Sequence, residues 1–481
     1  MNHNSSRSAA LSRREMFRRS ACGFGAIALA GICADESNAA ITDEVHKTLA
    51  QRPPMFPAKA KRVIFVFMQG GPSQVDTFDY KPELIARDGQ EIDFTGVRFG
   101  TFGKASKRKL LKPLWKFQQH GECGQYVSEL FPHMAGHVDK MCMIQSMHTE
   151  GVAHGPSTLF LHTGATNLVR PSIGSWITYG LGTPNQNLPG FVTINPSASK
   201  GGPRNYSNAF LPTIFQGTAI GRAGQPVANS TIHNIRNHHM SPKAQRDQFQ
   251  FLQQLNRQQA ARSGDSDELE ATIESYELAF RMQMSAPGIL DLDRETAETR
   301  AMYGIGEKAT DDFGRQCLMA RRLAESGVRF IQVNYSDEST NPRWDQHSDM
   351  PKHAEHALAT DKPVAGLLQD LAERGLLEDT LVWWGAEFGR TPFAQGRDGR
   401  DHNPRGFTVW LAGGGVKAGY RYGVTDEIGH QAVENKVHMH DLHATILHLM
   451  GLDHEQLTFK YAGRNFRLTD VAGNVIHDLI A

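Results

Sequence analysis

The chain has no excess of charge of either sign, because 51 Lys and Arg residues balance 51 Asp and Glu residues. Without a basic excess, nothing in the composition indicates a nucleic-acid partner. Cysteine is also scarce, with five residues in 481. The later three, Cys123, Cys142 and Cys317, form neither a metal-binding pattern nor a disulfide framework. Cys123 and Cys142 could still bridge in an oxidising compartment, and spacing alone does not decide this.

The sequence also lacks an apolar run long enough to cross a membrane. Its N-terminal apolar run, 21–34, has about 14 residues, whereas a span needs about 20. The pair Arg13 and Arg14 precedes this run, and small residues at 37–39 follow it. This order predicts a twin-arginine signal peptide over 1–39, and hence a periplasmic or extracellular protein without a membrane span in the mature chain. The alternative is a basic tail packed on the domain.

Four short apolar runs predict the buried strands of a mainly parallel α/β sheet. Such runs are typical of strands that are covered on both faces. A helical pattern at 363–375 lies between two of them, which favours alternating strands and helices. The four runs are 62–68, 330–334, 380–384 and 407–411.

The remaining segments suggest one large domain with two additions. Residues 40–60 are proline-rich near their end and predict a linker or arm, followed by the domain at 61–481. Within it, 225–310 is rich in Gln, Arg and Glu with apolar residues at helical period, which predicts a helical insertion. This insertion is a candidate lid or subunit contact, although its charges are also typical of a solvated helix face.

Histidines and carboxylates follow several of the predicted strands. In open α/β sheets, ligands bind beyond the carboxyl ends of the strands, where these loops meet. Asp345, His347, Glu387 and His402 are therefore candidate ligands of a divalent metal, and the mixed oxygen and nitrogen set suits Zn, Mn or Fe. The alternative is a local hydrogen bond between Asp345 and His347.

The segment 154–164 predicts a helix whose first turn could bind an anion. Proline is favoured there, and exposed N–H groups at a helix start attract phosphate or sulfate. His154 is a candidate nucleophile, acid/base or ligand, and Ser157 a candidate catalytic residue. Ser157, Thr158 and Arg390 are candidate anion-binding residues. The alternative is an ordinary helix cap at Ser157 with His154 on the surface.

Four histidines near the C-terminus do not have strong metal-binding spacing. Ligand pairs on a helix are usually four residues apart, and this arrangement does not match that pattern. We therefore expect core or capping roles for His438, His440, His443 and His448.

Three segments resemble the sulfatases in order along the chain. Residues 154–164 match the sulfatase signature in register, 381–389 resemble its metal-binding strand, and 441–451 resemble its later helix. The resemblance implies the alkaline-phosphatase-like superfamily, with an alkaline-phosphatase/sulfatase-like sandwich built on a mainly parallel central sheet with helices on both faces. More closely, the chain resembles domain-of-unknown-function family 1501, through segments 70–79, 344–347, 387–392, 399–402 and 463–470.

The chain departs from the sulfatase pattern at three positions. His154 stands where the resemblance places the nucleophile, so formylglycine chemistry is excluded because no thiol or hydroxyl can be oxidised there. Gln69 replaces a metal-binding aspartate, and Phe388 replaces a histidine ligand. A reduced, one-metal site is therefore expected in place of a two-metal site.

The resemblance and the loop residues together favour an exported, metal-dependent hydrolase of sulfate or phosphate esters. Its substrate would be a small-molecule or polysaccharide ester outside the cytoplasm. The alternative is a non-catalytic secreted binding or cell-envelope protein on a decayed sulfatase-like fold, for which the replacements at Gln69 and His154 argue.

Overall fold

The computed structural model describes residues 49–93, 98–99, 103–104, 107–229, 240–263 and 267–481. The predicted signal peptide and the residues after it, up to residue 48, lie outside these ranges. Contacts divide the chain into two units, one of 1–47 with 237–266 and one of 48–236 with 267–481. The described helix of the first unit is α6 (Pro242–Ser263); every other element below belongs to the second unit.

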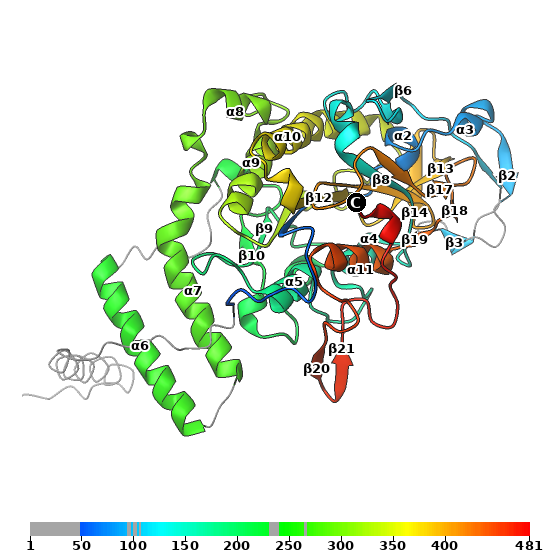
Figure 1. Ribbon diagram of the computed structural model, residues 1–481. Helices are drawn as coiled ribbons and strands as arrows, with labels where there is room; N and C mark the ends of the chain where they lie inside the picture. The colour runs from blue at the N-terminus through cyan, green and yellow to red at the C-terminus, as the bar shows by residue number, and fades with distance from the viewer. Residues whose placement is uncertain (1–48, 94–97, 100–102, 105–106, 230–239, 264–266) are drawn as a thin grey trace, which may run out of the picture. The chain divides into compact units, whose positions relative to one another are not determined.

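The second unit is built on a nine-stranded sheet (Figure 1). The strand order is β10-β9-β11-β1-β12-β15-β8-β16, and β19 also pairs with β8. Three of the predicted runs are its central strands, so the sequence located the middle of the sheet. The strands are β1 (Arg62–Met68), β8 (Met141–His148), β9 (Phe191–Ile194), β10 (Thr218–Ile220), β11 (Phe330–Tyr335), β12 (Thr380–Gly385), β15 (Phe407–Ala412), β16 (Tyr420–Tyr422) and β19 (Val437–His438).

The fourth predicted run, β15, is a strand but not a parallel one. It pairs antiparallel with β12 and with β8, whereas the other pairs in this sheet are parallel. Between β12 and β15 the chain forms the hairpin of β13 (Gly389–Gln395) and β14 (Gly399–Asn403). No helix crosses back over the sheet in this segment, so the chain re-enters the sheet from its carboxyl edge and runs the other way.

Side chains of β1 alternate between two hydrophobic cores, one on each face of the sheet. Ile64, Val66 and Met68 lie in the core that α9 (Asp311–Glu325) and α10 (His353–Glu373) cover. The odd-numbered side chains of the strand lie in the core that α4 (His154–Thr163), α5 (Ile173–Leu181) and α11 (Met439–Leu449) cover. Figure 1 shows these two helix groups on opposite sides of the strands. The predicted α/β class with helices on both faces is confirmed.

Two predicted helical regions differ in detail from the structure. The helix expected at 363–375 begins ten residues earlier, at His353, and contains Pro363. One missing N–H is tolerated because Pro363 is buried among the apolar residues that α10 packs on the core. The described residues of the stretch 225–310 are mostly helical. They include α6, α7 (Asp267–Leu290) and α8 (Ala297–Met302), but α6 and α7 belong to different units.

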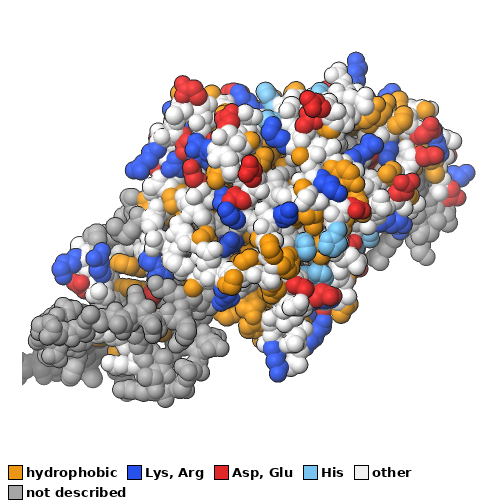
Figure 2. Space-filling model, viewed as in Figure 1, with side chains coloured by type: hydrophobic (Ala, Val, Ile, Leu, Met, Phe, Trp, Pro, Cys, Tyr) orange, Lys and Arg blue, Asp and Glu red, His pale blue; other side chains and the backbone are white. Residues whose placement is uncertain are grey.

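Short elements surround the sheet, among them α2 (Gln74–Thr77) and α3 (Pro82–Ala86). Cys123, Cys142 and Cys317 are free thiols, so the bridge considered from sequence is not formed. Basic and acidic side chains are intermingled on the face seen in Figure 2. None of the described helices has the length and apolarity needed to cross a membrane. The small hairpins are β2 (Glu91–Asp93) with β5 (Lys107–Lys109), β3 (Arg98–Phe99) with β4 (Gly103–Lys104), β6 (Phe117–His120) with β7 (Gln125–Ser128), β17 (Val424–Thr425) with β18 (Ala432–Glu434), and β20 (Phe459–Tyr461) with β21 (Arg464–Phe466).

Candidate metal centre

The carboxyl ends of three sheet strands carry the candidate site. Asp345 and His347 lie in the loop after β11, and the hairpin after β12 carries His402. β8 runs in the same direction as β12, because both are antiparallel to β15. The segment after β8 therefore starts from the same edge, and it leads into α4, whose first residue is His154. The sheet direction thus explains why residues nearly 250 positions apart meet here.

Four side chains converge at this edge: His154, Asp345, His347 and His402. One nitrogen or oxygen from each lies within 4.8 Å of the others. The Nε2 atom of His154 is 3.1 Å from Asp345 Oδ2, and that of His347 is 3.0 Å from Asp345 Oδ1. His402 Nε2 lies 3.3 Å from the same Oδ1. The structure therefore contains a His/Asp cluster that could hold a metal, and three of its members are ligands predicted from the sequence.

Each of the three imidazoles has its Nδ1 on a protein oxygen outside the cluster. His154 Nδ1 is 2.6 Å from Glu387 Oε1, and His347 Nδ1 is 2.5 Å from the Oε1 of Gln395. His402 Nδ1 is 3.0 Å from the carbonyl oxygen of Val152. Since these oxygens accept hydrogen bonds, the proton of each neutral ring is placed on Nδ1. All three Nε2 lone pairs then point into the cluster, as in metal-bound histidines whose outer nitrogen is held by a carboxylate or carbonyl.

Two nitrogen atoms of the cluster lie unusually close to each other. His347 Nε2 and His402 Nε2 are only 3.0 Å apart, so two lone pairs would repel unless a proton or a cation lay between them. His154 Nε2 is buried and makes no hydrogen bond of good geometry with any described residue. A nitrogen-rich set of this kind fits Zn, Mn or Fe, whereas Mg and Ca prefer oxygen ligands.

Burial and neighbouring charges shift the pKa values of these groups in different directions. Burial lowers the pKa of His402 to about 4, with Arg390 acting in the same direction. Burial also opposes the charged form of His154, but the neighbouring carboxylates of Asp345 and Glu387 outweigh it and raise its pKa. The pKa of Asp345 is lowered, because its contacts with the three histidines and the charge of Arg390 together outweigh the effect of burial. Asp345 is therefore an anion at neutral pH, and His154 holds a proton more readily than His402.

Glu387, predicted as a ligand, lies behind His154 instead of among the converging atoms. Its Oε1 contacts the His154 ring, and the Gly70 N–H donates to the same oxygen at 3.0 Å. Gly70 has a φ of 109°, and a Cβ there would lie 2.5 Å from the Pro342 carbonyl oxygen. The close contact between the loops after β1 and β11 therefore requires glycine at this position. Of the predicted residues, Glu387 orients a histidine, and His154 is placed to be the fourth ligand.

Arg390, predicted to bind an anion, is fully buried and contacts Asp345 directly. Its Nη2 is 2.7 Å from Asp345 Oδ1, and its Nε donates to the Gly71 carbonyl at 2.9 Å. Its Nη1 donates to the Arg400 carbonyl at 3.3 Å. With these bonds made, the guanidinium holds the Asp345 carboxylate in place and balances its charge.

Ser157 and Thr158 are fully buried inside α4, which begins three residues before Ser157. Ala153 is the residue that caps the helix, so the alternative of a cap at Ser157 with His154 on the surface is wrong. The two hydroxyls make no hydrogen bond with any residue that the structure describes. They therefore lie on the helix that carries His154, but their oxygens are not among the converging donor atoms.

Sequence reasoning missed the groups that orient His347 and His402. Gln395 lies on β13 and the Val152 carbonyl lies before α4, and neither has a recognisable pattern in the sequence. From the sequence, Phe388 indicates only the loss of a ligand. Its ring stacks on His402 at 4.3 Å between centroids and forms an apolar wall of the cluster.

Two of the four C-terminal histidines have the capping and core roles expected of them. His438 caps α11 in a reciprocal arrangement with Asp441. His443 is buried, and its Nε2 donates to the Leu161 carbonyl at 2.8 Å.

The fold and the cluster define an α/β protein with a mainly parallel sheet and a candidate metal centre at the carboxyl edge of that sheet. The chain belongs to the family described as "Protein of unknown function (DUF1501)", whose model matches residues 60–480. No curated protein matches the sequence. The family resemblance expected from the sequence is therefore confirmed over nearly the whole domain.

The chain is also similar to solved structures of alkaline-phosphatase and sulfatase superfamily members. The lipoteichoic acid synthase LtaP from Listeria monocytogenes matches with a TM-score of 0.35 and 10% identity, over 88% of this chain and 78% of that one. A magnesium-bound mutant of TAB5 alkaline phosphatase matches with a TM-score of 0.34 and 11% identity, over 82% and 99%. PsFucS1 sulfatase from Pseudoalteromonas sp. matches with a TM-score of 0.33 and 12% identity, over 82% and 68%.

Proposed function

We propose that this protein is an exported hydrolase of sulfate or phosphate esters that uses one divalent metal ion. The observation that carries the proposal is the convergence of three Nε2 atoms and one carboxylate, with each Nδ1 held from outside. His154, Asp345, His347 and His402 would be the ligands. A metal bound there would polarise an ester oxygen and lower the pKa of a coordinated water.

The position of the cluster supports access by a substrate. The side chain of His347 is 18% exposed, whereas those of His154, Asp345 and His402 are 9% exposed or less. His347 is thus the most exposed of the four residues, and an approaching ester would meet it first. The first turn of α4 lies beside it through His154, and the N–H groups of a helix start favour an anionic ester group.

Two residues next to the candidate ligands would keep the side chains of His154 and Asp345 in fixed positions during turnover. Glu387 holds the His154 ring by its Nδ1 proton and is itself held by the Gly70 N–H. Arg390 fixes Asp345 from the buried side. A site held in place by such partners needs little reorganisation when charge develops on a bound ester.

Metal analysis and an ester panel test the proposal together. Purified protein is analysed for Zn, Mn and Fe, stripped with a chelator and assayed with p-nitrophenyl sulfate and p-nitrophenyl phosphate before and after metal is restored. We expect bound metal and hydrolysis that returns with it. Absence of both metal and metal-stimulated hydrolysis would overturn the proposal.

A second candidate function is that of a non-catalytic binding or envelope protein with a structural metal. It is favoured by four protein donors around one point and by His154 at the position of the nucleophile. Two results would favour this candidate over the hydrolase. The protein would bind metal but hydrolyse no ester, and variants of the cluster residues would lose ligand binding only when they also lose the fold.

A further inference from the structure

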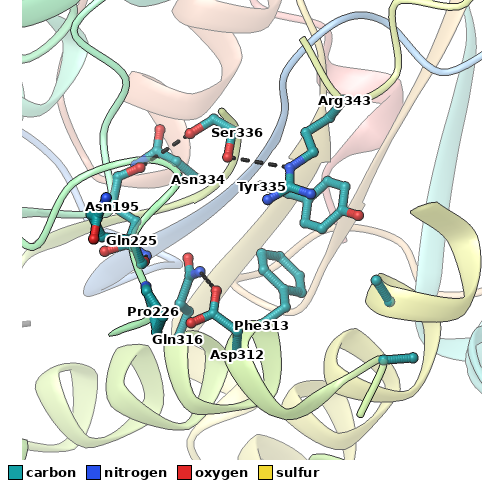
Figure 3. A pocket seen from close by; sticks show the side chains of 13 residues that line it. Asn195, Gln225, Pro226, Asp312, Phe313, Gln316, Asn334, Tyr335, Ser336 and Arg343 are labelled. Atoms are coloured by element: carbon teal, nitrogen blue, oxygen red, sulfur yellow. Dashed lines mark hydrogen bonds between the residues drawn. The ribbon is translucent and has the colours of Figure 1, made fainter. Parts of the chain in front are cut away.

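Cavities lie at both edges of the central sheet. The one in Figure 3, of about 260 Å³, lies beyond the carboxyl ends of β9 and β11, where Asn334 Nδ2 already donates to Thr193 Oγ1 at 2.9 Å. The other, the amino-edge cavity, has about 510 Å³ and is lined by Arg62 at the start of β1 and Arg329 directly before β11. The seven residues of β1, about 20 Å in length, separate this edge from the edge that carries the candidate metal centre.

Positive charge gathers on the wall of the amino-edge cavity. Among the described residues no Asp or Glu lines it, whereas four basic residues do: Arg52, Lys61, Arg62 and Arg329. Asp379, outside the lining, pairs with Lys61 at 3.1 Å and with Arg62 at 3.3 Å. The three cations Lys61, Arg62 and Arg329 thus have one neighbouring carboxylate between them. A cavity with a positive wall of this kind favours an anion.

Arg329 is 7% exposed, yet no described carboxylate pairs with its guanidinium. Its Nε donates to the Gly182 carbonyl at 3.2 Å, and its Nη1 donates to the Lys61 carbonyl at 2.8 Å. Its Nη2 bonds to no described residue and is not fully buried, so it is open to the cavity that Arg329 lines. Because a buried charge without a counter-ion is costly, an anion placed beside Nη2 would be stabilised.

The pKa of Arg329 reflects the same lack of a partner. Burial and the charge of Arg62 lower this pKa to about 10, from an ordinary value of 12.5. The side chain is still a cation at neutral pH. A guanidinium held in one plane matches the oxygens of a carboxylate or phosphate group, which accept parallel N–H bonds. One of these groups therefore fits the charged part of the wall.

The remainder of the lining is largely apolar. Leu181, Val328 and Met450 are buried, whereas Pro54 and Ala58 are exposed. A small inorganic anion would leave this surface in contact with water. A hydrocarbon chain attached to the anion would cover the apolar lining and add to the affinity.

We propose that the amino-edge cavity binds an amphiphilic organic anion, namely a carboxylate or phosphate group carried on a hydrocarbon chain. The anionic group contacts Arg329 Nη2, and the chain packs against the apolar lining. The cavity volume of about 510 Å³ suits such a molecule, since ligand sites commonly have about 300–1,000 Å³. The inference goes beyond the proposed hydrolase and needs no metal, because none of the four cluster residues lines this cavity.

Isothermal titration calorimetry on the purified full chain tests the cavity without any assay of activity. The probes are octanoate and octylphosphonate, which have no ester bond to hydrolyse. Octyl glucoside has the same chain without a charge, and inorganic phosphate has the charge without a chain. All are used below the concentration at which they form micelles. Each titration is repeated after treatment with a chelator, which separates this cavity from the candidate metal centre.

Three variants and one control locate the binding. Arg329→Met removes the guanidinium, and Ala58→Glu places a carboxylate on the lining at an exposed position. Ala58→Gln is the uncharged match of the second variant. Arg294→Met removes an arginine whose side chain is 67% exposed and which does not line the cavity, so it is the control.

We expect octanoate or octylphosphonate to bind the wild type and Arg294→Met equally, and more tightly than octyl glucoside or inorganic phosphate. Arg329→Met should weaken this binding about tenfold to a hundredfold, because a charged hydrogen bond is lost. Ala58→Glu should bind more weakly than Ala58→Gln, because its carboxylate repels the probe. Chelation should change nothing.

Several results would overturn the proposal. They are binding of neither octyl anion, equal binding of octyl glucoside or inorganic phosphate, and loss of binding on chelation. Unchanged binding in Arg329→Met would also overturn it. If Arg329→Met does not fold, the two Ala58 variants decide the result, and equal binding by both would overturn the proposal.

Discussion

Each imidazole of the cluster has one nitrogen on a protein oxygen and the other facing the shared centre. Neutral histidine carries a single ring proton, so the outer oxygens of Glu387, Gln395 and Val152 decide which nitrogen is left with a lone pair. This division of roles distinguishes the cluster from histidines that merely pack together. In the proposed metal site, Glu387 would therefore affect the affinity for the ion without contacting it.

Replacing Glu387 by Gln should weaken metal binding by about tenfold to a hundredfold, because the carboxylate that orients His154 and raises its basicity is lost. Competition with a chromogenic chelator measures the affinity. Glu378→Gln, at an exposed position, is the control and should bind metal as the wild type does. Equal affinity in the Glu387 variant would show that His154 is not held for this purpose.

His443 should make the stability of the fold depend on pH. Burial and the neighbouring His440 lower its pKa to about 3, below the ordinary value of 6.5. The folded state therefore excludes the proton that the unfolded state takes up. The stability that neutral, buried His443 contributes to the fold is complete above pH 6.5 and is lost as the pH falls toward 3. Within that window it changes the free energy of unfolding by at most about 1.4 kcal/mol per pH unit.

Urea unfolding at about pH 7 and about pH 5 measures this dependence. His443→Gln, which keeps an N–H donor for Leu161, should lose less stability over this range than the wild type. His133→Gln, at an exposed position, should behave as the wild type. If the stability of His443→Gln depended on pH as strongly as that of the wild type, His443 would not be the cause of this dependence.

At the scale of the elements, buried polar contacts hold the site loops together. Gln74 on α2 donates to the Arg390 carbonyl at 2.8 Å and accepts from the Arg390 N–H at 2.8 Å. Asp76, also on α2, pairs with Arg400 of β14 at 2.7 Å, and neither side chain is exposed. The segments that resemble the family thus include residues that fix the hairpin carrying His402.

Asp76→Ala should therefore destabilise the protein by about 3–5 kcal/mol, because it leaves the Arg400 guanidinium buried without its partner. The midpoint and slope of urea unfolding measure the loss. Asp88→Ala, which removes a partly exposed partner of Lys112, should cost about 1 kcal/mol or less. Similar losses in both variants would show that the buried pair has no special role.

The sequence predicted the elements whose own residues determine them. β1, β11 and β12 are continuous apolar runs, and their bounds differ little from the prediction. The direction of β15 depends on the hairpin before it, and the start of α10 depends on packing around Pro363. These are tertiary effects, so local pattern could not predict them.

The candidate site was predictable in part for the same reason. The rule for carboxyl ends of strands placed Asp345, His347 and His402 in one region, and the structure brings them together. The displacement of Glu387 to a position behind His154 depends on the contact of Gly70 with the loop after β11. Sequence order contains no information about that contact.

At the scale of the whole molecule, export remains a prediction from residues outside the described part. If the arginine pair directs folded protein through the twin-arginine route, replacing Arg13 and Arg14 by Lys should retain the precursor in the cytoplasm. Immunoblots of periplasmic and cytoplasmic fractions measure this. Lys59→Arg, a charge-conserving change beyond the signal, is the control. Normal export of the double variant would contradict the assigned route.

The metal content of the purified chain tests the central claim most directly. Elemental mass spectrometry measures the metal content of the wild type and of the variants Asp345→Ala and His347→Ala. The wild type should contain about one Zn, Mn or Fe ion per folded chain. Either variant should lose it while circular dichroism shows that the fold persists. The account would be contradicted if the wild type folded but bound none of these metals when they were supplied, and so behaved as the two variants do.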